Sequence, residues 1–121
     1  MSNMTAVEIK AFVPARDFAL SKRFYEDLGF TVASSSDGIA YLRHGETSFL
    51  LQDFYEEIHA ENFMMHLLVE DVEAWWRHVQ EQDLVAKYGV KAEPPADQPW
   101  RIRDFVLIDP TGVLWRIGQN I

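Results

Sequence analysis

The stretch VEIKAFVPARDFALSKRFYEDLGF, residues 7–30, sets a strand pattern directly before a helix pattern. Every second residue from Val7 to Val13 is apolar, which is the alternation of a half-buried β-strand. Further along, Asp17 stands where a helix N-cap is needed and Gly29 where a helix ends, with apolar residues at helical spacing between them. The stretch therefore predicts a β-strand over Val7–Val13, followed by an α-helix that Asp17 caps.

Three short strand-like runs follow this helix. They are Phe30–Ala33, Ile39–Leu42 and Ser48–Phe54, and the turn sequences SSSDG and HGE separate them. The same order recurs in the second half of the chain, where Asp71 is placed to cap a helix. The strands expected there are Phe63–Val69, Leu84–Tyr88, Arg103–Ile108 and Val113–Ile117, and the Pro-rich segment EPPADQPW is expected to break regular structure before the third of them.

These patterns predict an internal repeat of a βαβββ unit. Module 1 would span about residues 5–56 and module 2 about residues 61–119 of a single domain, residues 1–121. One helix covers only one face of a sheet, so two such units leave two sheet faces that can curve around a cleft. We therefore expect an α+β fold with two βαβββ modules forming a cleft, the kind of place where small molecules bind.

The composition narrows the functions that this fold could serve. The 121 residues contain 11 Lys and Arg against 19 Asp and Glu, a formal net charge of −8, which disfavours nucleic acid as a partner. There is no cysteine, so disulfides, thiol nucleophiles and Cys-ligated metals are excluded. No apolar run is long enough to span a membrane and the first residues do not resemble a secretory signal, so the expected location is the cytoplasm.

Trp100 is the sharpest candidate for ligand contact. It follows a proline in an irregular polar segment, where an aromatic face could stack on a conjugated or cationic ligand. The alternative is that Trp100 plugs one end of the core. Phe54 and Tyr55, at the exit of a predicted strand, could form an aromatic wall opposite Trp100 or could shield the core at the end of a hairpin.

Among the four histidines, only His66 has a pattern that suggests a site. It alternates with Met64 onto the predicted cleft side of its strand, so it either lines a ligand pocket or is an ordinary half-buried histidine. The other three, His44, His59 and His78, are expected at the surface. The acidic cluster FYEEIHAEN, residues 54–62, is expected to be a solvated loop that could also attract a cationic ligand.

Two stretches resemble a known superfamily. FVPARDFALSKRFYEDLGF, residues 12–30, and FVLIDPTGVLWRIGQN, residues 105–120, are similar to the vicinal-oxygen-chelate superfamily, which includes glyoxalases, extradiol dioxygenases and bleomycin resistance proteins. Together with QPW ahead of the last hairpin, they are most similar to the bleomycin resistance branch. The resemblance implies a homodimer, often with exchanged first strands, and a ligand between the subunits. It also aligns His66 with a groove aromatic and Trp100 with a similar tryptophan of those proteins.

The resemblance further assigns the superfamily's metal-ligand positions to residues of this chain. They fall on Lys10, on Leu51 or its neighbour Leu50, on Met64 and on Arg116. None of these side chains is a good ligand for a hard divalent ion, and two cations would repel it. The resemblance therefore implies a protein without a metal or other cofactor, and it argues against a metal-dependent enzyme.

The function expected from these observations is metal-independent binding and sequestration of an aromatic or cationic small molecule, such as a glycopeptide antibiotic, by a homodimer. The expected ligand-binding residues are Trp100, His66, Met64, Phe54, Tyr55, Lys10 and Arg116, and no catalytic residue is assigned. The alternative is a glyoxalase-like lyase or isomerase of unknown substrate that uses His66, Lys10 or Arg116 without a metal. A domain that serves only as an interaction module is the third possibility.

Overall fold

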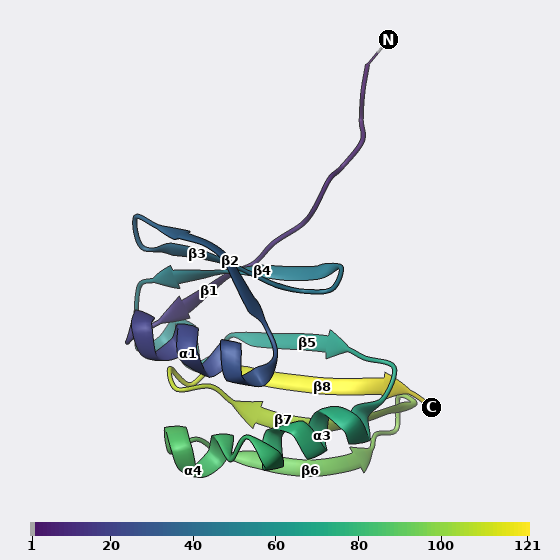
Figure 1. The fold of residues 1–121 in the computed structure, drawn as a ribbon. Coiled ribbons are helices and arrows are strands. Elements are labelled where there is room, and N and C mark those ends of the chain that lie inside the picture. Colours follow the sequence, from purple (N-terminus) through teal and green to yellow (C-terminus); the bar gives the residue numbers. More distant parts are fainter. Residues whose placement is uncertain (1) are drawn as a thin grey trace.

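The computed structural model describes residues 2–121 and contains two four-stranded sheets (Figure 1). Module 1 comprises β1 (Phe12–Ala15), α1 (Phe18–Leu28), β2 (Thr31–Ser36), β3 (Ile39–His44) and β4 (Thr47–Asp53). Module 2 comprises β5 (Met64–Leu68), α3 (Val72–Glu81), α4 (Leu84–Tyr88), β6 (Ala92–Asp97), β7 (Ile102–Ile108) and β8 (Leu114–Asn120), and the short helix α2 (Glu57–Glu61) connects the modules.

The two sheets have the same topology, which confirms the predicted repeat. Sheet A has the strand order β1-β4-β3-β2, and sheet B has the order β5-β8-β7-β6. In each sheet the first strand pairs in parallel with the last, and the remaining pairs are antiparallel. Within residues 2–121, no helix is long and apolar enough to cross a membrane.

Both helix caps predicted from the sequence are present. The Asp17 carboxylate accepts a hydrogen bond from the Leu20 amide at 3.1 Å, and Asp71 accepts one from the Ala74 amide at the same distance. Gly29 ends α1 with a φ of 128°, a conformation that L side chains rarely adopt. These local signals placed both long helices correctly.

The prediction for the segment after α3 is wrong. Leu84–Tyr88 forms the helix α4, which buries Leu84 and packs against α1 and α3. The strand of this region is instead the Pro-rich β6. It tolerates Pro94 and Pro95 because it is an edge strand that pairs only with β7, and both prolines lie at a register shift between Glu93 and Ala96.

The first predicted strand is wrong over most of its length. Strand β1 begins only at Phe12, and the preceding residues form an extended arm that leaves the body of the molecule (Figure 1). Its apolar side chains are open to solvent, because Met4, Val7 and Ile9 are 89%, 93% and 96% exposed. The alternation predicted a strand from Val7, but residues 7–11 are not part of a strand, although the Ala11 carbonyl accepts a hydrogen bond from the Leu50 amide at 3.0 Å. The acidic segment predicted as a loop contains α2.

One hydrophobic core serves both modules. Tyr25 of α1 lies 5.0 Å from the ring centroid of Phe49 in sheet A and 5.5 Å from that of Trp115 in sheet B, and the last two rings are 5.3 Å apart. Trp115 is 2% exposed. Because the inner faces of both sheets meet in this core, their outer faces point away from it.

A buried polar cluster joins the modules inside this core. One oxygen of Asp109, in the turn before β8, accepts hydrogen bonds from three successive backbone amides, each at 2.9 Å. Its other oxygen accepts the hydroxyl proton of Tyr25, whose oxygen in turn accepts a 2.8 Å hydrogen bond from the Trp115 indole. Burial raises the pKa of Asp109, although these hydrogen bonds oppose the shift.

Candidate functional site

The outer face of sheet B brings together three of the predicted site residues. The strand register sets His66 beside Arg116, and Met64 lies two residues from His66 on the same face. Arg116 is also paired with Val106 of β7. Helix α3 packs on the opposite side of the sheet, so this face stays open, with Met64 59% and Leu68 51% exposed.

Arg116 is held in place by a carboxylate that the sequence prediction missed. Its guanidinium lies 3.3 and 3.4 Å from the two oxygens of Asp104, whose side chain is 1% exposed. Alternation along β7 would have placed Asp104 on the same face as Val106, but only the structure shows the ion pair. The Arg116 side chain is 30% exposed and can reach a ligand.

Trp100 lies on the surface, in the tight turn between β6 and β7. The Gln98 amide donates to the Ile102 carbonyl at 2.8 Å, and the Arg101 amide donates to the Gln98 carbonyl at 3.1 Å. Trp100 is 58% exposed, which rules out the alternative that it plugs the core. A turn held by two backbone hydrogen bonds therefore presents an accessible aromatic face.

Lys10 lies in the arm against sheet A and not beside Arg116. Its ammonium lies 4.7 Å from the centroid of the Tyr41 ring of sheet A. The neighbouring Glu8 accepts hydrogen bonds from the hydroxyls of Ser48 and Tyr41, which lower the pKa of Glu8, Ser48 contributing most. These contacts fix the last part of the arm against sheet A.

Phe54 and Tyr55 lie at the end of β4, 46% and 37% exposed. The Arg16 guanidinium is 5.3 Å from the centroid of the Tyr55 ring, and the His59 ring is 6.4 Å from that of Phe54. None of the ring contacts found among residues 2–121 joins either residue to Trp100. Whether they form a wall opposite Trp100 in an assembly stays a prediction.

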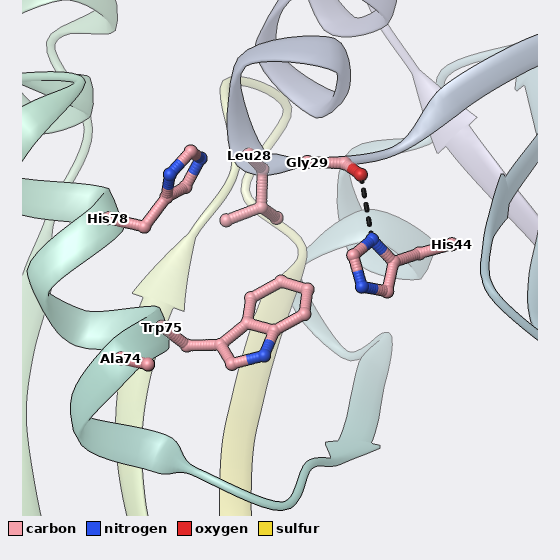
Figure 2. Close-up of a pocket in the computed structure, with 6 residues that line it drawn as sticks. All are labelled: Leu28, Gly29, His44, Ala74, Trp75 and His78. Carbon is pink, nitrogen blue, oxygen red and sulfur yellow. Dashed lines mark hydrogen bonds between the residues drawn. The ribbon is translucent and has the colours of Figure 1, made fainter.

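A small pocket lies between the modules on the helix side, with a volume of about 170 Å³ (Figure 2). It is lined by Leu28, Gly29, His44, Ala74, Trp75 and His78. Ring nitrogens of His44 and His78 donate to the carbonyls of Gly29 and Asp27, both at 2.8 Å. The two histidines therefore satisfy carbonyl groups at the end of α1, and the pocket is smaller than the roughly 300 Å³ at which ligand sites usually begin.

The sequence profile of the Glyoxalase/Bleomycin resistance protein/Dioxygenase superfamily matches residues 7–117. The chain belongs to this superfamily. A bleomycin resistance protein from Klebsiella pneumoniae is 29% identical over 115 residues, which cover 89% of this chain and 88% of that protein.

Solved structures of the superfamily share the fold. A bleomycin-binding protein crystallised with bleomycin has a TM-score of 0.80 at 24% identity, covering 96% of this chain and 100% of its own. The bleomycin-binding protein of Streptomyces verticillus, in complex with copper(II)-bleomycin, has a TM-score of 0.79 at 20% identity, covering 97% and 100%. At these identities the likeness shows the two-module architecture.

Of the two leucines considered for a metal-ligand position, only one faces away from the core. Leu51 is fully buried opposite Val13 and faces the core, so the outward position belongs to Leu50, which pairs with Phe12 and Tyr41. No group of three or more His, Cys, Asp or Glu suited to a metal occurs among residues 2–121. Leucine, lysine, methionine and arginine offer no ligand set for a hard divalent ion.

Proposed function

We propose that this protein binds and sequesters a cationic or aromatic small molecule of the bleomycin class, without a metal and without chemical conversion. The observation that carries the proposal is that Trp100 is exposed on the hydrogen-bonded turn between β6 and β7. A flat aromatic ring in this setting stacks on conjugated groups and attracts cations. The bleomycin-binding relatives support the same class of ligand.

The residues around His66 suit binding better than catalysis. General acid–base catalysis needs a proton acceptor and a donor at hydrogen-bonding distance from the reacting group. The register neighbour of His66 is Arg116, whose charge is already paired with Asp104. The formal net charge of −8 would attract a cationic ligand from a distance.

Isothermal titration calorimetry with metal-free bleomycin tests the proposed function. We expect saturable binding at one site per chain, and the same affinity after the protein has been dialysed against EDTA. Absence of both binding heat and a rise in melting temperature at millimolar bleomycin would contradict the proposal. Binding that disappears with EDTA and returns with Zn²⁺ or Ni²⁺ would favour the lyase alternative.

We further propose that the working form is a homodimer that pairs sheet A of one copy with sheet B of the other. The outer faces of sheets A and B both point away from the shared core, so they do not face each other within one chain. A cleft between a sheet A face and a sheet B face therefore requires a second chain. The arm supports this assembly, because Val7 and Ile9 alternate like a strand yet are 93% and 96% exposed. An apolar extended segment of this kind is suited to pair with a sheet edge of a second copy.

Deleting residues 2–9 is expected to convert the dimer into monomers. The full chain should show twice the 14.0 kDa chain mass by light scattering at micromolar concentration, and the shortened chain should show the single mass. Deleting only residues 2–3 is the matched control and should leave the dimer intact. A full-length mass near 14.0 kDa would overturn the proposed dimer.

A further inference from the structure

Asp104 is a buried carboxylate on a sheet face that is otherwise open. Its side chain is 1% exposed, whereas Met64 and Leu68 on the same face are 59% and 51% exposed. A buried charge is costly unless hydrogen bonds and an opposite charge compensate it. Asp104 has two side-chain partners, Arg116 and Gln98, and both belong to the candidate binding surface.

Through Gln98, Asp104 is connected to the turn that carries Trp100. The Gln98 side-chain amide donates to Asp104 at 3.0 Å, while its backbone groups make the two hydrogen bonds that close the turn. The neighbouring Gly118 leaves room for this arrangement, because a Cβ there would lie 2.8 Å from the Cβ of Asp104. One carboxylate therefore fixes both Arg116 and the segment that presents the indole.

Asp104 also sets the charge of this face. The charged side chains whose register places them on it are Arg116, Asp104 and the exposed Glu93, which pairs with Val106. Asp104 offsets the charge of Arg116, so the guanidinium is not an uncompensated cation that would repel a positive ligand. Without this carboxylate, the guanidinium would disfavour such a ligand.

We propose that Asp104 is the positioning and specificity-determining residue of the ligand site. It orients Trp100 through Gln98, and because it offsets the charge of Arg116, it allows a cationic ligand to bind beside the guanidinium. The specificity half of this inference rests on the proposed function. The positioning half concerns the free protein and can be tested without a ligand.

The positioning role is tested by NMR of the Trp100 side chain. The indole N–H signal is assigned by its loss in Trp100→Phe, and its heteronuclear NOE is then measured in each variant. We expect the NOE to fall clearly in Asp104→Ala and in Gln98→Ala. Asp97→Ala is the matched control, because this exposed carboxylate lies next to Gln98 but pairs with Arg103. An unchanged NOE in Gln98→Ala, a surface-turn variant that should fold normally, would overturn the positioning role.

The specificity role is tested with two probes that differ in terminal charge. Bleomycin A2 ends in a sulfonium cation, and bleomycinic acid ends in a carboxylate. In Asp104→Asn we expect the Kd for bleomycin A2 to rise about fivefold, as for one unpaired charge near the ligand, and the Kd for bleomycinic acid to stay constant or fall. Asp97→Asn makes the same change in net charge and should move both Kd values less than twofold.

Equal rises for both probes in Asp104→Asn would overturn the specificity role and leave Asp104 with positioning alone. If the wild-type protein binds neither probe, the proposed function fails and the specificity role falls with it. The NMR experiment separates the two failures, because its result does not depend on any ligand.

Discussion

Replacing Asp109 with alanine is expected to lower the free energy of unfolding by about 3–5 kcal/mol, the largest stability effect predicted for this protein. The substitution leaves three backbone amides of the turn and the hydroxyl of the fully buried Tyr25 without their acceptor. Tyr25 and Asp109 lie in different modules, so their hydrogen bond joins the two. We therefore expect both modules to unfold in one cooperative transition, with its midpoint at a lower urea concentration than in the wild type. Urea unfolding followed by circular dichroism measures it.

Asp109→Asn separates the hydrogen bonds from the charge. The carbonyl oxygen of Asn still accepts hydrogen bonds from the backbone amides, but its NH2 group leaves the Tyr25 hydroxyl without an acceptor. We therefore expect the free energy of unfolding to fall by about 1–3 kcal/mol. A loss below about 1 kcal/mol in Asp109→Ala would mean that the cluster contributes little to stability.

The raised pKa of Asp109 adds a pH dependence. The folded state holds this proton more tightly than the unfolded chain, in which the carboxyl has its ordinary pKa of 3.8. The advantage of the wild type over Asp109→Asn should therefore be greatest below that pH and should shrink as pH rises through the raised pKa. Unfolding of both variants across this range checks the sign, and an advantage that grows with pH would contradict it.

Replacing Trp100 with alanine is expected to weaken binding of bleomycin by roughly 1–3 kcal/mol, the range for one lost stacking or cation–π partner. Folding stability should change by less than about 0.5 kcal/mol, because Trp100 is 58% exposed and its removal leaves no cavity behind. Calorimetric titration and urea unfolding on the same variant measure both quantities.

Trp75→Ala is the matched control for this experiment. Trp75 is half-buried on α3, where its ring is 4.8 Å from that of His44, on the opposite side of sheet B from the candidate site. It should lose stability and keep its affinity for bleomycin, the reverse of Trp100→Ala. If Trp100→Ala binds as tightly as the wild type, the ligand site should be sought around His66 and Phe54.

Several features of the site could be placed from sequence alone. The alternation of β5 put Met64 and His66 on one face, and a tryptophan after proline in a polar segment pointed to an exposed indole. Other features depended on partners far along the chain. His78 contacts the Asp27 carbonyl across 51 residues, and nothing in the sequence around either residue indicates the pairing.

By itself, the sequence determined the repeat, the helix caps at Asp17 and Asp71, and the strand faces, because capping and alternation act between residues a few positions apart. The tertiary structure alone decided that the Pro-rich segment is an edge strand and that β1 begins only at Phe12, so that Val7 and Ile9 of the arm stay exposed. It also decided that Asp104 pairs with Arg116 and Gln98. Each of these outcomes depends on which strand lies beside which, and that choice is made by burial of the shared core and not by local sequence.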